Sequence, residues 1–321
     1  MIIVSLFICS TNMNVKSFLF RVLICGVLFV AVDQLAGRLI VFLNSVAGDK
    51  YKREEFIRHE MKSEMVLLGS SRCTHHYVPS VFEDSLGLST FNCGQRGNGI
   101  IYEYGRLQTI YERYTPNLIV VDFIEGDFSY CDNRKFLEFL KFDYGTNEAI
   151  DSLFYKIDRL SPLKMKIQSF KYNSTLCDLL LNTLLPDRGR FTEQGYYPLY
   201  GIFCDEENRV FSSIKQEIEL DSIKMFCIHE IASRKKPNSD IVFVLSPLYS
   251  EVNSELRSLL QKTAQMYDVP FLDYSNTPGI SCNPDMFEDM AHLNHHGALK
   301  FSQILAHDLK RMGYVKNKYD R

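Results

Sequence analysis

Five short apolar runs, separated by segments with helical periodicity, limit the folds open to this chain. The runs span residues 65–68, 88–92, 117–123, 240–246 and 269–273. Most of them are apolar at nearly every position, which is typical of strands buried on both faces. Helices are expected over residues 79–86, 100–114, 213–234, 252–267 and 298–312. This alternation predicts an α/β fold in which helices cover both faces of a five-stranded parallel sheet.

The predicted strand order along the chain also points to a ligand site. In open parallel sheets, ligands bind outside the carboxyl ends of the strands. Ser71, Gly94 and Asp127 follow the first three predicted strands. We therefore expect these three residues at one edge of the sheet.

Residues 17–36 form an apolar stretch of about bilayer-spanning length, interrupted by Arg21 and Asp33. We interpret it as a retained transmembrane anchor. A cleaved signal peptide is the main alternative, but no small-x-small cleavage site follows, and the apolar pattern resumes at residues 39–43. A buried helix of the domain fits less well, because the segment is apolar nearly all round.

The remaining chain divides around one irregular stretch. After the anchor (1–47), residues 48–64 read as a charged connector, expected to be a solvated helix. The domain then occupies residues 65–127 and 213–321. Between them, residues 128–212 lose the alternation of strands and helices and include a turn-rich piece at 185–190. We interpret this insertion as a helical and irregular lid or substrate-facing subdomain.

Composition excludes several classes of function. The net charge is -3 and no Lys/Arg-rich run occurs, so nucleic acid is not expected as a partner. Nine cysteines are present, and removing Cys9 and Cys25 of the N-terminal region leaves an odd number without CxxC spacing. Neither a disulfide framework nor a zinc site is indicated. No cofactor motif is found.

Two segments carry residues suited to acyl transfer. Ser71 follows Gly69 and Ser70 at the end of the first predicted strand, and Asp289 precedes His292 by three residues. A serine attacks an acyl carbonyl when a histidine takes its proton, and a carboxylate on the imidazole Nδ1 fixes the tautomer. The backbone N–H groups of Ser71 and Gly94 are expected to bind the oxyanion.

These segments resemble the ordered blocks of SGNH/GDSL hydrolases. The resemblance rests on Gly69-Ser70-Ser71, on Asn92-Cys93-Gly94, on the strand at 116–121, and on Asp289-x-x-His292-Leu293-Asn294 with Gly297. It implies a flavodoxin-like three-layer α/β/α fold, with Ser71 as nucleophile, His292 as base and Asp289 as the orienting carboxylate. Membrane-anchored relatives help to acylate cell-envelope polymers beside membrane-bound acyltransferases, which implies such a partner here.

The sequence departs from the family pattern at two blocks. Gly-Asp-Ser-Leu has become Gly-Ser-Ser-Arg, which places Ser70 in the Asp position. The third block, normally Gly-x-Asn-Asp, aligns with Ile124-Glu125-Gly126-Asp127, so the Asn that completes the family's oxyanion hole is missing.

Seven further residues are candidates for binding substrate. They are Arg72, His76, Tyr77, Asn98, Asp127, Tyr196 and Tyr197.

Three other groups of residues have alternative roles. The set His75, His76, His292, His295 and His296 could bind a metal, although its spacing matches no standard ligand set. Glu125 and Asp127 could act as the paired carboxylates of a glycosidase, but an ion pair is the expected role. The aromatic cluster at 196–203 fits either sugar stacking or a core for the insertion.

The sequence thus supports three hypotheses about function. The first is a membrane-anchored serine esterase or O-acyltransferase that acts on an acylated envelope or secreted carbohydrate. The second is a non-catalytic glycan-binding or scaffold protein of the same fold. The third is a lipid-directed esterase.

The flanking charges and the family resemblance point to opposite sides of the membrane. Positive charges after the anchor favour a cytoplasmic domain, but a long domain can cross the membrane regardless of the flanking charge. The family resemblance implies that the domain lies on the non-cytoplasmic side.

Overall fold

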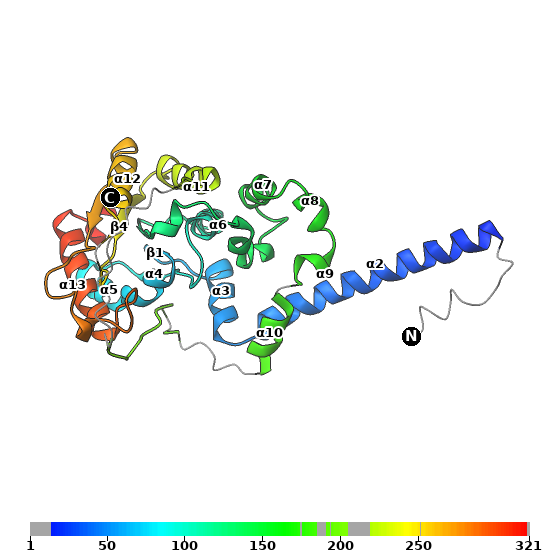
Figure 1. Ribbon diagram of the computed structural model, residues 1–321, viewed down its shortest axis with the longest axis horizontal. Helices are drawn as coiled ribbons and strands as arrows, with labels where there is room; N and C mark the ends of the chain where they lie inside the picture. Colours follow the sequence, from blue (N-terminus) through cyan, green and yellow to red (C-terminus); the bar gives the residue numbers. More distant parts are fainter. Residues whose placement is uncertain are drawn as a thin grey trace.

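A parallel five-stranded sheet forms the centre of the protein (Figure 1). The computed structural model describes residues 14–173, 175–184, 191–192, 194–204, 219–250 and 252–319. The strand order is β2-β1-β3-β4-β5, and every pairing is parallel. The strands are β1 (Met65–Gly69), β2 (Thr90–Asn92), β3 (Leu118–Asp122), β4 (Asp240–Leu245) and β5 (Phe271–Asp273). This is the flavodoxin-like order, and all five predicted strands are confirmed.

Helices cover both faces of the sheet. On one face lie α6 (Ile100–Tyr111), α11 (Ser222–Ser233) and α12 (Ser254–Met266). On the other lie α4 (Ser71–His76), α5 (Pro79–Leu86) and α13 (His295–Arg311). In β1, Val66 and Leu68 belong to the first apolar core, whereas Met65 and Leu67 belong to the second. Alternate residues of each strand thus enter different cores, which explains the unbroken apolar runs.

The predicted helices are present with shifted ends. α5 ends before Gly87, whose φ of 72° closes the helix in the left-handed conformation. α13 begins before the expected position, because the side chain of Asn294 accepts the N–H of Gly297 and caps it. The expected start of α11 at residues 213–218 lies outside the described residues. The short helix α4 directly after Ser70 was not expected.

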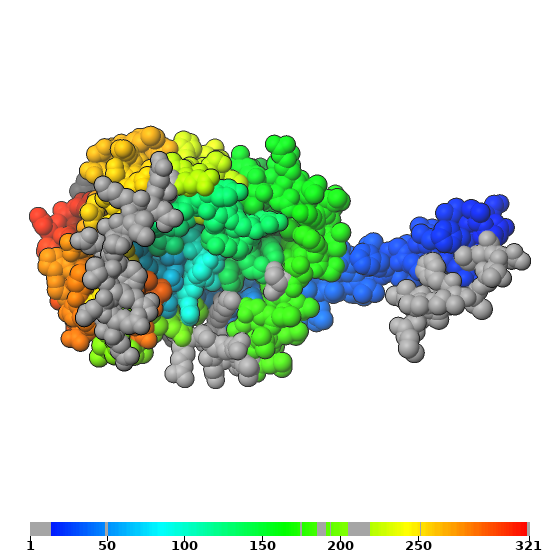
Figure 2. All heavy atoms as spheres, viewed as in Figure 1, coloured from blue at the N-terminus to red at the C-terminus, as the bar shows by residue number. Residues whose placement is uncertain are grey.

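The predicted anchor forms the helix α2 (Val15–Val46), which projects from the body of the protein (Figures 1 and 2). It is the one helix in the described part of the chain that is long and apolar enough to cross a membrane. No residue between 15 and 32 is buried. The helix extends further than expected, and its last turns pack against the domain.

The connector is a buried helix rather than a solvated one, which corrects the expectation. α3 (Asp49–His59) places Arg53 and Glu54 in the interior. Glu54 Oε2 lies 2.6 Å from the guanidinium of Arg106 in α6, and Arg53 donates to the carbonyls of Asn92 and Gly94 at 2.7 Å each. Arg53 and Glu54, two of the charges that suggested a solvated helix, are therefore paired inside the domain.

The described part of the insertion is mainly helical. It contains η2 (Asn133–Leu137), η3 (Phe139–Phe142), α7 (Glu148–Ile157), α8 (Ser161–Lys164), α9 (Gln168–Lys171) and α10 (Thr175–Leu184). α7 packs on α6, whereas α9 and α10 pack on α2. The turn-rich piece at 185–190 lies outside the described residues. Elsewhere in the described residues, short elements include η1 (Glu125–Asp127), η5 (Pro284–Met286) and α14 (Lys316–Tyr319).

Candidate active site

Ser71 stands where β1 ends and α4 begins, at the carboxyl edge of the sheet. A Cβ on Gly69 would lie 2.5 Å from the Cβ of Cys73, so the turn requires glycine. Ser71 remains partly exposed. As the first residue of a helix, it has a backbone N–H without an intrahelical acceptor.

Ser71 and His292 form a hydrogen bond across the two ends of the chain. Nε2 of His292 lies 2.8 Å from Oγ of Ser71. Nδ1 of the same ring lies 2.8 Å from Oδ2 and 3.0 Å from Oδ1 of Asp289. An ionised carboxylate accepts hydrogen bonds only, so Nδ1 carries the proton and Nε2 is free to accept from the serine hydroxyl.

The Asp289 carboxylate is held by its own loop. Oδ1 accepts the backbone N–H groups of Ala291 at 2.8 Å and His292 at 2.9 Å. Partial burial acts to raise the pKa of Asp289, but the hydrogen bonds from His292 and Ala291 outweigh it and lower the pKa. The carboxylate is therefore ionised at neutral pH, as the observed hydrogen bonds require.

His76 lies beneath the site rather than at its mouth, which corrects the expectation that it binds substrate. The side chain is fully buried. Its Nε2 accepts the N–H of Leu293 at 3.0 Å, and Nδ1 lies 3.0 Å from Oγ of Ser246. Burial holds the pKa of His76 well below its ordinary value. The neutral ring therefore ties α4 to the loop that carries His292.

Asp122, at the end of β3, is a buried residue that the sequence analysis missed. Its Oδ1 accepts from the hydroxyl of Tyr77 at 2.7 Å and from the N–H of Ser246 at 3.0 Å. Nε of Arg72 lies 3.6 Å from Oδ2, and the same guanidinium donates to the carbonyl of Phe123. Arg72 and Tyr77 are buried supports and do not face substrate, contrary to expectation. A carboxylate that ends an otherwise apolar strand is the signal that could have identified Asp122.

Gly94 is also corrected, because its N–H is already engaged. It donates to Oδ1 of Asn92 at 3.0 Å. The amide of Asn92 in turn donates to the carbonyls of Cys73 at 2.7 Å and Tyr77 at 3.0 Å. A Cβ on Gly94 would lie 2.6 Å from the backbone nitrogen of Thr74. Gly94 thus permits close packing of the β2 end against α4 and is not a free oxyanion donor in this structure.

A pocket of about 310 Å³ lies beside Ser71. It is lined by Ser70 and Asn98, by η1, and by the first residues of the insertion, including the exposed Tyr130. Oγ of Ser70 and Oδ1 of Asn98 are buried and have no hydrogen-bond partner within the described chain. Such atoms are costly unless a ligand or water satisfies them. Asn98 thus lies where a substrate-binding residue is expected.

Asp127 lines the same pocket but its oxygens hold two loops together. Oδ1 accepts the N–H of Ile100 and Oδ2 accepts the N–H of Ile124, each at 2.8 Å. Burial raises the pKa of Asp127 to about 6, against the lowering effect of these bonds. Neither the expected ion pair nor a substrate contact is the principal role of this carboxylate; it is a clamp.

The aromatic residues of the insertion divide between core and site. Tyr196 is buried, and its hydroxyl lies 3.0 Å from Nδ1 of His295. Contrary to expectation, its side chain is not exposed to substrate. Tyr197 is partly exposed, and its ring contacts the edge of His75, whose ring contacts that of His292. Burial lowers the pKa of His75 to about 4. Tyr197 therefore stays close to the site. In the described residues, no group of His, Cys, Asp or Glu is arranged to hold a metal ion.

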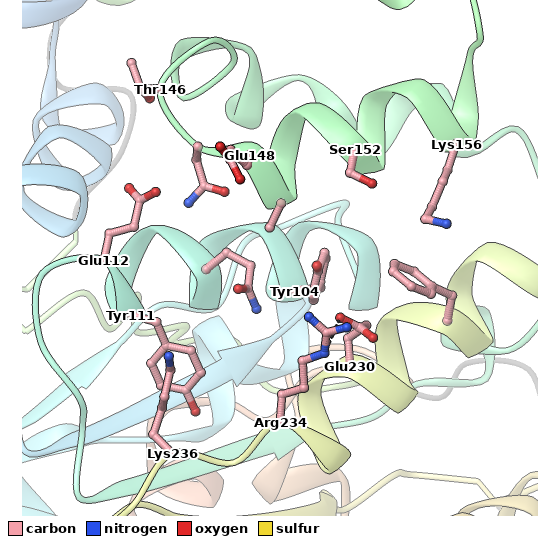
Figure 3. A pocket seen from close by; sticks show the side chains of 14 residues that line it. Tyr104, Tyr111, Glu112, Thr146, Glu148, Ser152, Lys156, Glu230, Arg234 and Lys236 are labelled. Carbon is pink, nitrogen blue, oxygen red and sulfur yellow. Dashed lines mark ion pairs between the residues drawn. The ribbon is translucent and has the colours of Figure 1, made fainter.

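A second hollow lies away from Ser71, between α6, α7 and α11 (Figure 3). Its volume is about 820 Å³. Lys156 lies over the ring of Phe226 and Lys236 over the ring of Tyr111. A lysine thus already covers one face of each of these two rings.

Comparisons with known proteins give distant structural likeness only. No family model and no curated protein match the sequence. A gut microbial diltiazem-metabolizing enzyme matches with a TM-score of 0.36 and 13% identity, over 78% of this chain and 46% of that chain. A family two carbohydrate esterase from Clostridium thermocellum, in complex with cellohexaose, matches with a TM-score of 0.36 and 11% identity, over 78% of this chain and 65% of that chain. The chain thus spans less than two thirds of either structure, and likeness at this level carries no argument about activity.

Proposed function

We propose that the protein is a serine esterase or O-acyltransferase that acts on acyl esters of a carbohydrate. The observation that carries the proposal is the 2.8 Å contact between Nε2 of His292 and Oγ of Ser71, in a ring oriented by Asp289. The hydroxyl of Ser71 attacks the acyl carbon while its proton passes to Nε2. The ester C–O bond then breaks, and the imidazolium returns the proton to the departing alcohol.

The acyl-Ser71 intermediate is resolved by a second acceptor. Water gives hydrolysis, and a sugar hydroxyl gives transfer of the acyl group. In either case His292 takes the proton of the acceptor and returns it to Oγ of Ser71. The N–H of Ser71 is assigned to the oxyanion, because the start of a helix leaves it without an intrahelical acceptor.

The pocket beside Ser71 favours a hydroxyl-bearing substrate over a lipid. The unpartnered oxygens of Ser70 and Asn98 can accept hydrogen bonds from sugar hydroxyls. Tyr130, 68% exposed at the same pocket, offers an aromatic face for a sugar ring. An acyl chain would leave both oxygens without a partner, which costs about 1–3 kcal/mol for each buried group.

A non-catalytic glycan-binding protein is the second candidate. The observation that favours it is the N–H of Gly94, which Asn92 engages at 3.0 Å and thereby withholds from an oxyanion. Together with the missing third-block Asn, this leaves fewer donors than an efficient hydrolase uses. Loss of one such donor typically lowers kcat by about 10²–10³-fold.

Turnover of a short-chain aryl ester separates the two candidates. The full chain in detergent should release the aryl alcohol, and Ser71→Ala should not. If neither protein turns over the ester while both retain the same glycan on an affinity column, binding without catalysis is the function. An equal rate for both proteins would show that the reaction does not use Ser71.

We further propose that α2 anchors the protein in a membrane with the domain on the non-cytoplasmic side, beside a membrane-bound acyltransferase. The length and apolar surface of α2 support an anchor. The side rests on the family resemblance alone. Protease added to bacterial spheroplasts that express the chain should digest the domain. Protection until the membrane is broken would place it in the cytoplasm.

A further inference from the structure

The surroundings of α2 change at Asp33. Residues 15–32 contact no other part of the described domain closely enough to be buried, whereas Asp33, Gly37, Ile40 and Asn44 form a buried stripe at helical spacing. At a rise of about 1.5 Å per residue, the unburied part is roughly 27 Å long, close to the hydrocarbon thickness of a bilayer. Asp33 therefore marks the end of the domain that faces the membrane, if α2 is the anchor.

Asp33 fastens the insertion to α2 at this level. Its carboxylate accepts the N–H of Gln168 at 2.7 Å and that of Ser169 at 2.8 Å, the first two residues of α9. Gly37 allows the two helices to touch, because a Cβ there would lie 2.6 Å from Cγ of Gln168. Asp33, one of the two charged residues that interrupt the apolar segment, thus has a partner in the domain, and its contacts couple α9 to α2.

The surface next to this junction is apolar and exposed. We call it the α8–α9 face and define it by four side chains: Leu160, Leu163, Ile167 and Phe170. Leu163 is 65% exposed. The nearby charges are mainly basic: Arg159 and Lys166 are exposed, and Lys164 pairs with Asp158 at 2.6 Å. Figure 1 shows α8 and α9 at the end of the body from which α2 projects.

We propose that the α8–α9 face rests in the surface of the same bilayer that α2 crosses. This proposal depends on the proposed membrane anchor. The face is continuous with α2, through the Asp33 contacts, and lies where the spanning length ends. Its apolar side chains suit the acyl boundary, and its basic side chains suit anionic headgroups. A second contact beside a single helix would fix how the domain, and with it Ser71, stands above the membrane.

The absence of tryptophan from the chain gives a direct test. Single-tryptophan variants of the full chain are reconstituted into liposomes that contain lipids brominated near the glycerol end of the acyl chain. Leu163→Trp reports on the α8–α9 face, and Phe20→Trp reports on α2. Met266→Trp is the matched control, because Met266 is 74% exposed on α12, at the end of the domain away from α2 (Figure 1).

We expect bromine to quench the tryptophan fluorescence of Leu163→Trp and Phe20→Trp but not that of Met266→Trp. Quenching of Phe20→Trp with none at Leu163→Trp would overturn the lipid contact and leave the anchor intact. Absence of quenching at Phe20→Trp would overturn the anchor and the lipid contact together.

Discussion

Nε2 of His76 accepts the backbone N–H of Leu293 at 3.0 Å. This single bond joins two segments from opposite ends of the chain. His76 ends the helix that begins at Ser71, and Leu293 follows His292 directly. The contact therefore helps to set the distance between the proposed nucleophile and the proposed base. It lies in the interior of the protein, where substrate does not reach.

Replacing His76 by phenylalanine should slow acylation without weakening substrate binding. The ring would remain but both hydrogen bonds would be lost. We expect kcat to fall by about 10²-fold, the effect of a misplacement of about 1 Å, while KM stays unchanged. Steady-state kinetics with an aryl ester give both constants. His229→Phe changes an exposed histidine on α11 and should behave as the wild type. Equal kcat for His76→Phe and wild type would remove His76 from the positioning of the site.

Asn98→Ala should discriminate between substrates. Its unpartnered oxygen has no counterpart on a simple aryl acetate, so turnover of that ester should be unchanged. An acetylated sugar should lose a hydrogen bond, and kcat/KM should fall about 10-fold, equivalent to about 1.4 kcal/mol. If both substrates lose activity equally, Asn98 acts on the acyl group or on the fold, and not on the sugar.

Asn92→Ala should destabilise the fold where Asn98→Ala does not. Asn92 is fully buried; its amide joins β2 to α4 by donating to the carbonyls of Cys73 and Tyr77, and its Oδ1 accepts the N–H of Gly94. We expect a loss of about 2–4 kcal/mol in the free energy of unfolding. Chemical denaturation of the detergent-solubilised chain measures it, with Asn98→Ala as the matched control. A loss no larger than that of the control would show that the Asn92 contacts contribute little.

Stability should decline as the pH falls from 6.5 to about 4. Burial lowers the pKa of His75 from 6.5 to about 4 in the folded protein. Below pH 6.5, His75 binds a proton in the unfolded chain but not in the folded protein, so protonation stabilises the unfolded state. This one residue lowers the free energy of unfolding by about 2 kcal/mol at about pH 5. His75→Phe should therefore show a shallower pH dependence in this window. An unchanged slope would mean that His75 is charged in the folded protein.

The strands could be predicted from sequence because their signal is local. An unbroken apolar run needs burial on both faces, and only a central sheet strand provides it here. The segment with Asp289 and His292 was equally readable, since the two residues share one turn. Such features depend on neighbours within a few positions.

Features that depend on distant partners, or on which group a side chain binds, could not be predicted. α3 looks solvated until Arg106, far along the chain, is seen to pair with Glu54. Asp33 looks like a break in an apolar helix until it caps α9. Gly94 looks like an oxyanion donor until the side chain of Asn92, two residues earlier, takes its N–H. In each case, a long-range or side-chain contact determines which polar group is available.

Labelling by a fluorophosphonate probe tests the central proposal most directly. The probe reacts selectively with a serine that a neighbouring base activates. Intact mass spectrometry of the full chain should show one adduct on the wild type and on Ser70→Ala, and none on Ser71→Ala. An adduct that persists on Ser71→Ala, or a folded wild type that takes no label, would contradict the assignment of Ser71 as the nucleophile.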